Sequence, residues 1–244
     1  MNVGYKQPSF YTKLRDIAFR YRHLGRLYAS LRPRKNFDVH YIIGHYSSGT
    51  TLLDRLISMH PACARLHTEG VQLVYFLDTP EDYGQRRFWI KAYNSLKRSL
   101  SDDEVRFAHS IWCKVCDYNT NTSCVIEKSV VNILRISDFL QFNDKSKVIH
   151  IHRKPEDIIK SYSRRKLLQK EDDLALLKQQ INLTNTIAKN IEKHRIYSLD
   201  YSDLMKNPVS ELQRIYRFLG LHHISVTYDN DNVKVGSISQ KLEF

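Results

Sequence analysis

The stretch Val39-His-Tyr-Ile-Ile-Gly44-His-Tyr-Ser-Ser-Gly49-Thr50-Thr51-Leu-Leu joins an apolar, β-branched run to two glycines separated by four residues, and a helix-compatible segment follows. The spacing is that of the phosphate-binding loop G-x-x-x-x-G-K-S/T, in which backbone N–H groups at a helix N-terminus bind phosphate oxygens. Thr50 stands where that motif has lysine. Because this lysine binds the β- and γ-phosphates of a nucleoside triphosphate, the stretch points away from an ordinary ATPase or GTPase and toward a ligand with fewer phosphates. A plain strand–turn–helix connection is the alternative for this motif taken alone.

Bulk properties indicate a basic globular protein. The chain has 244 residues, a net charge of +12 and a hydrophobic content of 42%, which suit one domain with a sheet covered on both faces. The positive charge implies anionic partners such as nucleotide phosphates, acidic polysaccharide, nucleic acid or a membrane surface. Nucleic acid is the least supported of these, because the sequence has no zinc-finger spacing, RNP-like aromatic run or basic zipper.

Residues 1–36 differ from the rest, and we expect a basic amphipathic extension followed by a single domain at 37–244. Such a helix would make peripheral contact with anionic lipid through residues 10–31. The favoured alternative is a helix that docks on the domain while its arginines face solvent. No run of 18 apolar residues and no signal-peptide core occurs. We therefore expect a cytoplasmic protein, or a soluble catalytic fragment of an anchored one.

Short apolar strands alternate with helices along the rest of the chain. After the strand, loop and helix at 38–59, strands are predicted at 123–126, 147–151 and 195–199, and helices at 85–100, 130–141, 155–169, 171–192 and 208–219. This alternation predicts an α/β fold, in which helices flank a parallel sheet on both faces as in P-loop nucleotide-binding proteins. The ligand site of such a sheet lies at the carboxyl ends of its strands.

The cysteines indicate neither a disulfide scaffold nor a metal site. There are four, Cys63, Cys113, Cys116 and Cys124, which are too few for a scaffold. The second and third have the C-x-x-C spacing of redox or zinc sites, but no second C-x-x-C accompanies them. Ordinary thiols, no bound metal and a reducing compartment are the prediction.

Two further motifs follow strand ends. Val148-Ile-His-Ile-His-Arg153 places an arginine at the end of an apolar strand, and Ser161 lies two helical turns into the next helix. Guanidinium and hydroxyl together suit a second, isolated phosphate, although an arginine at a strand end is commonly a surface ion pair. Tyr201 follows another strand, where its ring could stack on a base or cap the core.

Together these motifs resemble the sulfotransferase family that uses 3′-phosphoadenosine 5′-phosphosulfate (PAPS), over nearly all of the chain beyond the basic extension. Ser48-Gly49-Thr50-Thr51 looks like that family's 5′-phosphosulfate loop, written S-G-T-T. Arg153 and Ser161 look like its 3′-phosphate pair. Tyr201-Ser-Asp-Leu-Met-Lys-Asn-Pro208 with Phe218-Leu219-Gly220 resembles its Y-E-D-L-x-x-x-P and F-L-G signature. The resemblance implies PAPS as sulfuryl donor and transfer without magnesium, which fits the missing lysine.

Two places depart from the family pattern. Many relatives have lysine or arginine where this chain has Ser47, one residue before S-G-T-T, in contact with the bridging oxygen of the donor. A serine donates a hydrogen bond but supplies no charge, so either His45 or Lys128 compensates, or activity is reduced or lost. The C-terminal R-K-G-x-x-G loop of cytosolic relatives is also missing. The segment at 234–239 resembles the shorter V-x-S-x-S type instead, which implies Lys234 and Ser239 at the 3′-phosphate.

The resemblance also implies catalytic residues. Lys128 ends the apolar run Val125-Ile-Glu127 and looks like the family's lysine that stabilises the transferring sulfuryl group or the leaving phosphate. The alternative is a surface lysine paired with Glu127. The run at 60–70 resembles the tyrosylprotein and carbohydrate branches, where a glutamate base follows the second strand, so Glu69 is the predicted base. His67 competes because imidazole titrates near neutral pH, and a purely structural carboxylate is the alternative for Glu69.

The predicted function is transfer of a sulfuryl group from PAPS to a hydroxyl. The section at about 63–122 mixes basic and aromatic residues, which favours a carbohydrate or peptidyl hydroxyl, including anionic acceptors, over a small apolar phenol or steroid; these residues are Tyr75, Phe76, Tyr83, Arg86, Arg87, Phe88, Trp89, Lys91, Lys97 and Arg98. One alternative is a P-loop kinase-like phosphotransferase, which needs the lysine that Thr50 replaces and an acidic magnesium ligand. Another is a non-catalytic module that binds a nucleotide or a polyanion.

Overall fold

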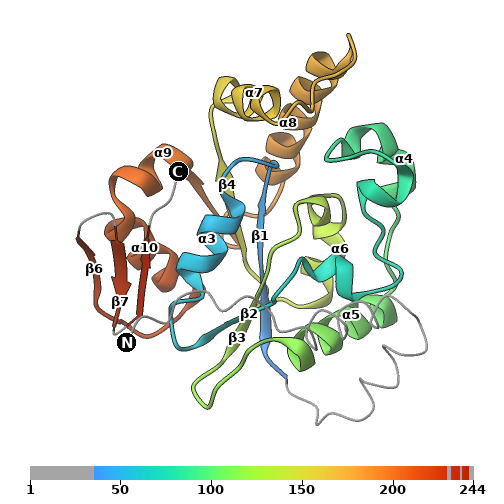
Figure 1. Cartoon of the computed structure of the whole chain (residues 1–244). Coiled ribbons are helices and arrows are strands. Elements are labelled where there is room, and N and C mark those ends of the chain that lie inside the picture. Colours follow the sequence, from blue (N-terminus) through green and yellow to red (C-terminus); the bar gives the residue numbers. More distant parts are fainter. Residues whose placement is uncertain (1–35, 230–231, 237, 242–244) are drawn as a thin grey trace.

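The computed structural model describes residues 36–229, 232–236 and 238–241. Its centre is a five-stranded parallel sheet in the order β2-β3-β1-β4-β5 (Figure 1), and these strands span Cys63–Arg65, Cys124–Glu127, Asp38–Gly44, Val148–His152 and Ile196–Asp200. A smaller antiparallel sheet has the order β6-β7-β8, and its strands span Val226–Asp229, Asn232–Val235 and Ile238–Lys241. The predicted parallel sheet is confirmed.

Helices and short 3₁₀ turns connect the strands. The α-helices are α3 Thr50–Ile57, α4 Tyr93–Leu96, α5 Asp102–Val115, α6 Ile136–Phe142, α7 Pro155–Arg164, α8 Asp173–Lys189, α9 Tyr201–Lys206 and α10 Pro208–Leu219. The 3₁₀ turns are η1 Gly70–Leu73, η2 Pro80–Tyr83, η3 Trp89–Ala92 and η4 Val130–Arg135.

Both faces of the main sheet are buried. Tyr41 and Ile43 of β1 lie in one core with residues of α5 and α6, whereas Ile42 lies in a second core with residues of α3 and α10. Because successive strand residues point to opposite faces, these two cores show that helices cover both sides of the sheet, as Figure 1 also shows. The predicted α/β fold with two covered faces is therefore confirmed.

Several predicted helices were wrong in extent. The helix predicted at 85–100 is replaced by η3 and α4, because the backbone turns at Gly84 and Arg87, where φ is 68° and 63°. The helix predicted at 155–169 ends at Arg164, shortly before Lys166 with φ of 52°. Helix α5 was not predicted at all, although a capping box between Ser101 and Glu104 begins it.

The predicted extension at 1–36, with its lipid-contacting helix at 10–31, lies outside the described residues except for residue 36. Within the described ranges, no helix is both long and apolar enough to cross a membrane.

The carboxyl ends of the parallel strands lie at one edge of the sheet. The last residues of β1, β3, β4 and β5 are Gly44, Glu127, His152 and Asp200. The phosphate-binding loop, Lys128, Arg153 and Tyr201 each follow one of these ends directly. Sequence segments far apart in the chain are thereby brought to the edge where α/β sheets bind their ligands.

Candidate active site

The loop between β1 and α3 can only be built with glycine at both ends. A Cβ on Gly44 would lie 2.5 Å from the carbonyl oxygen of Ile151, and a Cβ on Gly49 would lie 2.5 Å from the Tyr201 ring. Gly49 also has a φ of 101°, which other residues rarely adopt. The Ser48 hydroxyl donates to the carbonyl of His45 at 2.7 Å and closes the turn. The sequence motif is therefore a tightly folded loop rather than a plain connection.

The N-terminus of α3 is suited to an anion. Its N-cap is Gly49, and in the described structure no side chain caps the helix and no acidic residue lies in its first turn. The first N–H groups of a helix lack intrahelical acceptors and carry a partial positive charge. Next to them the hydroxyl of Ser47, whose φ is 69°, is buried and has no hydrogen-bond partner among the described residues. These donors fit the 5′-phosphosulfate of the predicted donor.

His45 cannot replace the cation that Ser47 lacks. Burial lowers the pKa of His45 to about 4, so the ring is neutral at neutral pH. Its Nδ1 lies 2.7 Å from the Tyr46 carbonyl, and its Nε2 lies 2.8 Å from the side-chain nitrogen of Gln180. This arrangement assigns the proton to Nδ1, because the carbonyl only accepts and the amide nitrogen only donates. Of the two compensating residues considered from the sequence, His45 is excluded and Lys128 remains.

Arg153 lies against the phosphate-binding loop. Its guanidinium donates to the carbonyl of Ser47 at 3.2 Å and lies 4.4 Å from the centre of the Tyr201 ring. Asp157 is 3.9 Å away, which is too long for a strong ion pair. Ser161, the other half of the predicted 3′-phosphate pair, is buried on α7. Arg153 thus joins the loop to Tyr201, and the ring face that it covers is not open to a base in this arrangement.

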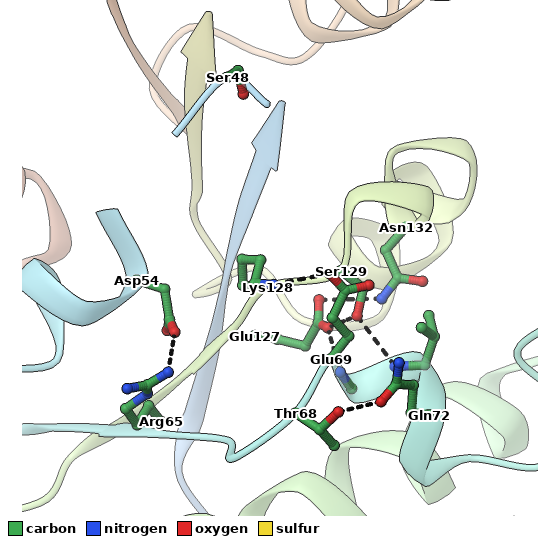
Figure 2. Close-up of polar contacts among 12 residues, drawn as sticks. Ser48, Asp54, Arg65, Thr68, Glu69, Gln72, Glu127, Lys128, Ser129 and Asn132 are labelled. Carbon is green, nitrogen blue, oxygen red and sulfur yellow. Dashed lines mark hydrogen bonds and ion pairs between the residues drawn. The ribbon is translucent and has the colours of Figure 1, made fainter. Parts of the chain in front are cut away.

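Lys128 and Glu69 form an ion pair. The lysine Nζ lies 2.8 Å from Glu69 Oε1, and the two side chains are 15% and 23% exposed (Figure 2). The alternative prediction, that Lys128 pairs with Glu127, is wrong, because its partner is Glu69. His67, the competing base, instead lies 2.9 Å from Asp117 through Nε2. The predicted lysine and the predicted base therefore lie within hydrogen-bonding distance of each other, which lets both act on one reacting group.

A small polar pocket connects these residues to α3. It has a volume of about 170 Å³, and its lining includes Thr51, His67, Glu69 and Lys128 together with Asp54, Arg55 and Arg65. Asp54 of α3 accepts from Arg65 at the end of β2 at 2.8 Å, as Figure 2 shows. A larger hollow of about 640 Å³ among η4, α6 and α8 contains none of the predicted site residues. The predicted catalytic residues Lys128, Glu69 and His67 thus line the smaller pocket, whereas the predicted 3′-phosphate residues do not.

Glu127 is a buried residue that sequence reasoning missed. Its side chain is fully buried, and burial raises its pKa to about 7 although the hydrogen bonds from Ser129 and Asn132 oppose the shift. The sequence held a signal, because in a sheet covered on both faces a glutamate in an apolar strand must be buried. From the sequence, Glu127 was considered only as an alternative partner of Lys128.

The remaining predicted residues lie elsewhere or remain untested. Lys234 of β7 pairs in register with Ser239 of β8 in the antiparallel sheet. None of the four cysteines, all within the described ranges, forms a disulfide, and the described residues contain no cluster of three or more His, Cys, Asp or Glu able to hold a metal. On the predicted acceptor side, Trp89 and Phe88 are core residues. Lys91 pairs with Asp173 and Arg98 with Glu104, so these four side chains serve the fold.

Comparison with known proteins agrees with this geometry. A family model described as the sulfotransferase family matches residues 40–225. Similar solved structures include sulfotransferase STF9 from Mycobacterium avium (TM-score 0.54, 11% identity, 88% of this chain and 74% of that chain). A sulfotransferase from Alicyclobacillus acidocaldarius (0.51, 14%, 77% and 82%) and the sulfotransferase domain from the curacin biosynthetic pathway (0.50, 18%, 78% and 76%) are also similar. No curated protein sequence matches the chain. At these identities the structural likeness shows the fold alone. The family model matches most of the chain, and the chain therefore belongs to the sulfotransferase family.

Proposed function

We propose that this chain transfers a sulfuryl group from PAPS to a hydroxyl of a polar acceptor. The observation that carries the proposal is the Lys128–Glu69 ion pair, 2.8 Å across, in a pocket that Thr51 of the phosphate-binding loop also lines. A cation and a carboxylate beside an anion-binding helix N-terminus are the groups that sulfuryl transfer needs. Thr50 in the lysine position disfavours the alternative of a kinase-like phosphotransferase.

In the proposed reaction the acceptor oxygen attacks the sulfur of PAPS. A new O–S bond forms, the bond from sulfur to the bridging phosphate oxygen breaks, and its electron pair leaves with 3′-phosphoadenosine 5′-phosphate (PAP). The proton of the acceptor hydroxyl passes to the carboxylate of Glu69, whose Oε1 accepts a hydrogen bond from Lys128 at 2.8 Å. The ammonium of Lys128 then stabilises the charge that develops on the bridging oxygen, because neither Ser47 nor neutral His45 supplies that charge.

Arg153 is the proposed ligand of the 3′-phosphate, with Ser161, Lys234 and Ser239 as further contacts. It already lies at the loop, with its guanidinium on the Ser47 carbonyl. A guanidinium offers several donors to phosphate oxygens in a planar arrangement.

The proposed acceptor is a carbohydrate or peptidyl hydroxyl, with anionic acceptors favoured. Support comes from the lining of the small pocket, which includes Arg55, Arg65 and His67 beside Lys128. This polar lining suits an acceptor that forms hydrogen bonds and offers little apolar surface to a phenol or steroid. A panel assay with radiolabelled PAPS tests the choice: sulfation of simple phenols, with saccharides and acidic tyrosine peptides unmodified, would exclude it.

Calorimetry with PAP separates the competing functions. Tight PAP binding without magnesium, together with label transfer from PAPS, supports the sulfotransferase. Binding of ATP only in the presence of magnesium supports the phosphotransferase. PAP binding without transfer to any acceptor indicates a non-catalytic nucleotide-binding module, and no nucleotide binding overturns the assignment of the loop.

A further inference from the structure

The carboxyl of Glu127 is surrounded by donors from two separate segments. Its Oε1 accepts from the backbone N–H of Gly70 at 3.0 Å and from the hydroxyl of Ser129, and its Oε2 accepts from the amide of Asn132 at 3.1 Å. Figure 2 shows Glu127 with Ser129 and Asn132 beside the Lys128–Glu69 pair. One fully buried carboxyl therefore connects the segment after β2 to the segment after β3.

Further hydrogen bonds hold the same backbone from other directions. The hydroxyl of Ser129, while donating to Glu127, accepts from the N–H of Val71 at 3.2 Å. The indole N–H of Trp112 on α5 donates to the carbonyl of Gly70 at 3.0 Å. Both backbone groups of Gly70 are thus engaged by side chains. The backbone position of the start of η1 is fixed by side chains from β3, from the residue before η4 and from α5.

The two proposed catalytic residues are sequence neighbours of the residues that this network joins. Glu69 directly precedes Gly70, and Lys128 directly follows Glu127. The Cα atoms of the two proposed catalytic residues are consequently held by the two ends of one hydrogen-bond network. The 2.8 Å separation of Lys128 Nζ and Glu69 Oε1 is that of a charge-assisted hydrogen bond, so the two groups meet at one point of the pocket.

Burying a carboxyl here costs more free energy than burying an apolar side chain of the same size. Burial opposes its ionisation and raises its pKa to about 7, and the charge of Glu69 adds to the effect. An apolar side chain of similar size would fill the same volume without the cost of desolvation. Leucine or isoleucine, however, would leave the N–H of Gly70 and the amide of Asn132 buried without acceptors. What Glu127 contributes is a pair of acceptor oxygens at a defined place.

We propose that Glu127 is a positioning residue, which holds Glu69 and Lys128 at their working separation by tying the backbone of Gly70 to the end of β3. The proposal rests on the proposed sulfuryl transfer. Without this tie the segment at 68–71 keeps only the contacts of Ser129 and Trp112, and it can shift relative to Lys128. A displacement of about 1 Å can cost roughly a hundredfold in rate, whereas donor binding at the α3 N-terminus is left intact.

The test compares Glu127→Ala with Glu127→Gln. Alanine removes both acceptor oxygens, and we expect kcat to fall about a hundredfold, with little change in PAP affinity. Glutamine keeps one acceptor oxygen for Gly70 and Ser129. Its NH₂ group can donate to Asn132 Oδ1, which is buried and has no partner among the described residues, once the Asn132 amide is flipped. We therefore expect Glu127→Gln to recover turnover to within about tenfold of the wild type.

A matched control and a second variant keep the test decisive. Glu211 is also a buried glutamate, but it contacts Tyr197 and Arg214 on the side of α10, and Glu211→Gln should leave kcat unchanged. If Glu127→Ala does not fold, Ser129→Ala removes only the hydroxyl between Glu127 and Val71. That variant should lower kcat about tenfold at unchanged PAP affinity.

Hydrogen exchange distinguishes failure of this proposal from failure of the proposed function. The amides of Gly70 and Val71 should exchange faster in Glu127→Ala than in the wild type, and in Glu211→Gln they should not. Wild-type turnover in Glu127→Ala, unchanged exchange of these amides, or equal losses in the alanine and glutamine variants would each overturn the positioning role. A wild-type chain that transfers no sulfuryl group would instead overturn the proposed function, and exchange would still report whether Glu127 holds this segment.

Discussion

Replacing Glu127 with glutamine should flatten the pH dependence of the free energy of unfolding. Burial raises the pKa of this carboxyl from 4.5 to about 7 in the folded protein. The folded state therefore holds the proton more tightly than the unfolded state does. The stability contributed by the protonated carboxyl is fully present below pH 4.5 and is lost as the pH rises through about 7. Glutamine does not titrate, so the variant lacks this loss.

The size of the effect follows from the shift. One pKa unit corresponds to about 1.4 kcal/mol, so the rise from 4.5 to about 7 corresponds to about 3 kcal/mol in all. Applied between about pH 5 and pH 8, the linkage relation gives a loss of about 2 to 3 kcal/mol for this group. Domains are stable by only about 5–15 kcal/mol, so the loss is large enough to measure.

Urea unfolding of the wild type and Glu127→Gln at about pH 5 and pH 8 measures this loss of stability. The change in unfolding free energy between the two pH values is taken for each protein. Subtracting the change in Glu127→Gln from that in the wild type isolates Glu127, because the other titrating groups cancel. Equal changes in the wild type and Glu127→Gln would refute the reasoning, since they would mean that burial does not shift this carboxyl.

Three further predictions concern the proposed site. Arg153→Ala should weaken binding of PAP about ten- to hundredfold while hardly affecting adenosine 5′-phosphate. Calorimetry checks this, with exposed Lys154→Ala as control, and equal losses for both nucleotides would remove Arg153 from the 3′ site. Lys128→Ala should lower kcat by about two to three orders of magnitude at nearly constant PAP affinity, and near-normal turnover of labelled PAPS would leave Lys128 as a structural partner of Glu69 only. Gly49→Ala should abolish PAP binding, because φ is 101° and the new Cβ would lie 2.5 Å from a tyrosine ring. Gly84→Ala, whose Cβ would meet nothing within 4 Å, is the control, and retained binding in Gly49→Ala would show that the loop is not the nucleotide site.

The sequence sufficed for some regular elements, such as α10 and β3, and for the edge where the site lies. Helix α10 has the predicted bounds of 208–219, because proline at its start and glycine after its end mark it clearly. Strand β3 spans Cys124–Glu127 against a prediction of 123–126. Since parallel strands end at one edge, the predicted loop, Lys128 and Arg153 could be placed near each other without knowledge of any contact.

Pairings between distant segments could not be predicted in this way. The sequence neighbour Glu127 was the obvious alternative partner of Lys128, yet the observed partner is Glu69, which is far from it in the chain. The neutrality of His45 depends on its burial, and the position of its proton depends on contact with Gln180 of α8. Such contacts depend on how helices and loops pack against the sheet, and periodicity carries no information about that packing.

The lack of space around Gly70 limits how this chain can change through evolution. A Cβ on Gly70 would lie 2.7 Å from Glu127 Oε1 and 2.7 Å from Trp112 Nε1. Neither neighbour can withdraw, because each is buried and hydrogen-bonded to Gly70 itself. A larger residue at position 70 is therefore acceptable only after the glutamate or the tryptophan has become smaller. Among relatives, these three positions should substitute together, and a lineage that loses the glycine should already have lost at least one of the two side chains that surround it.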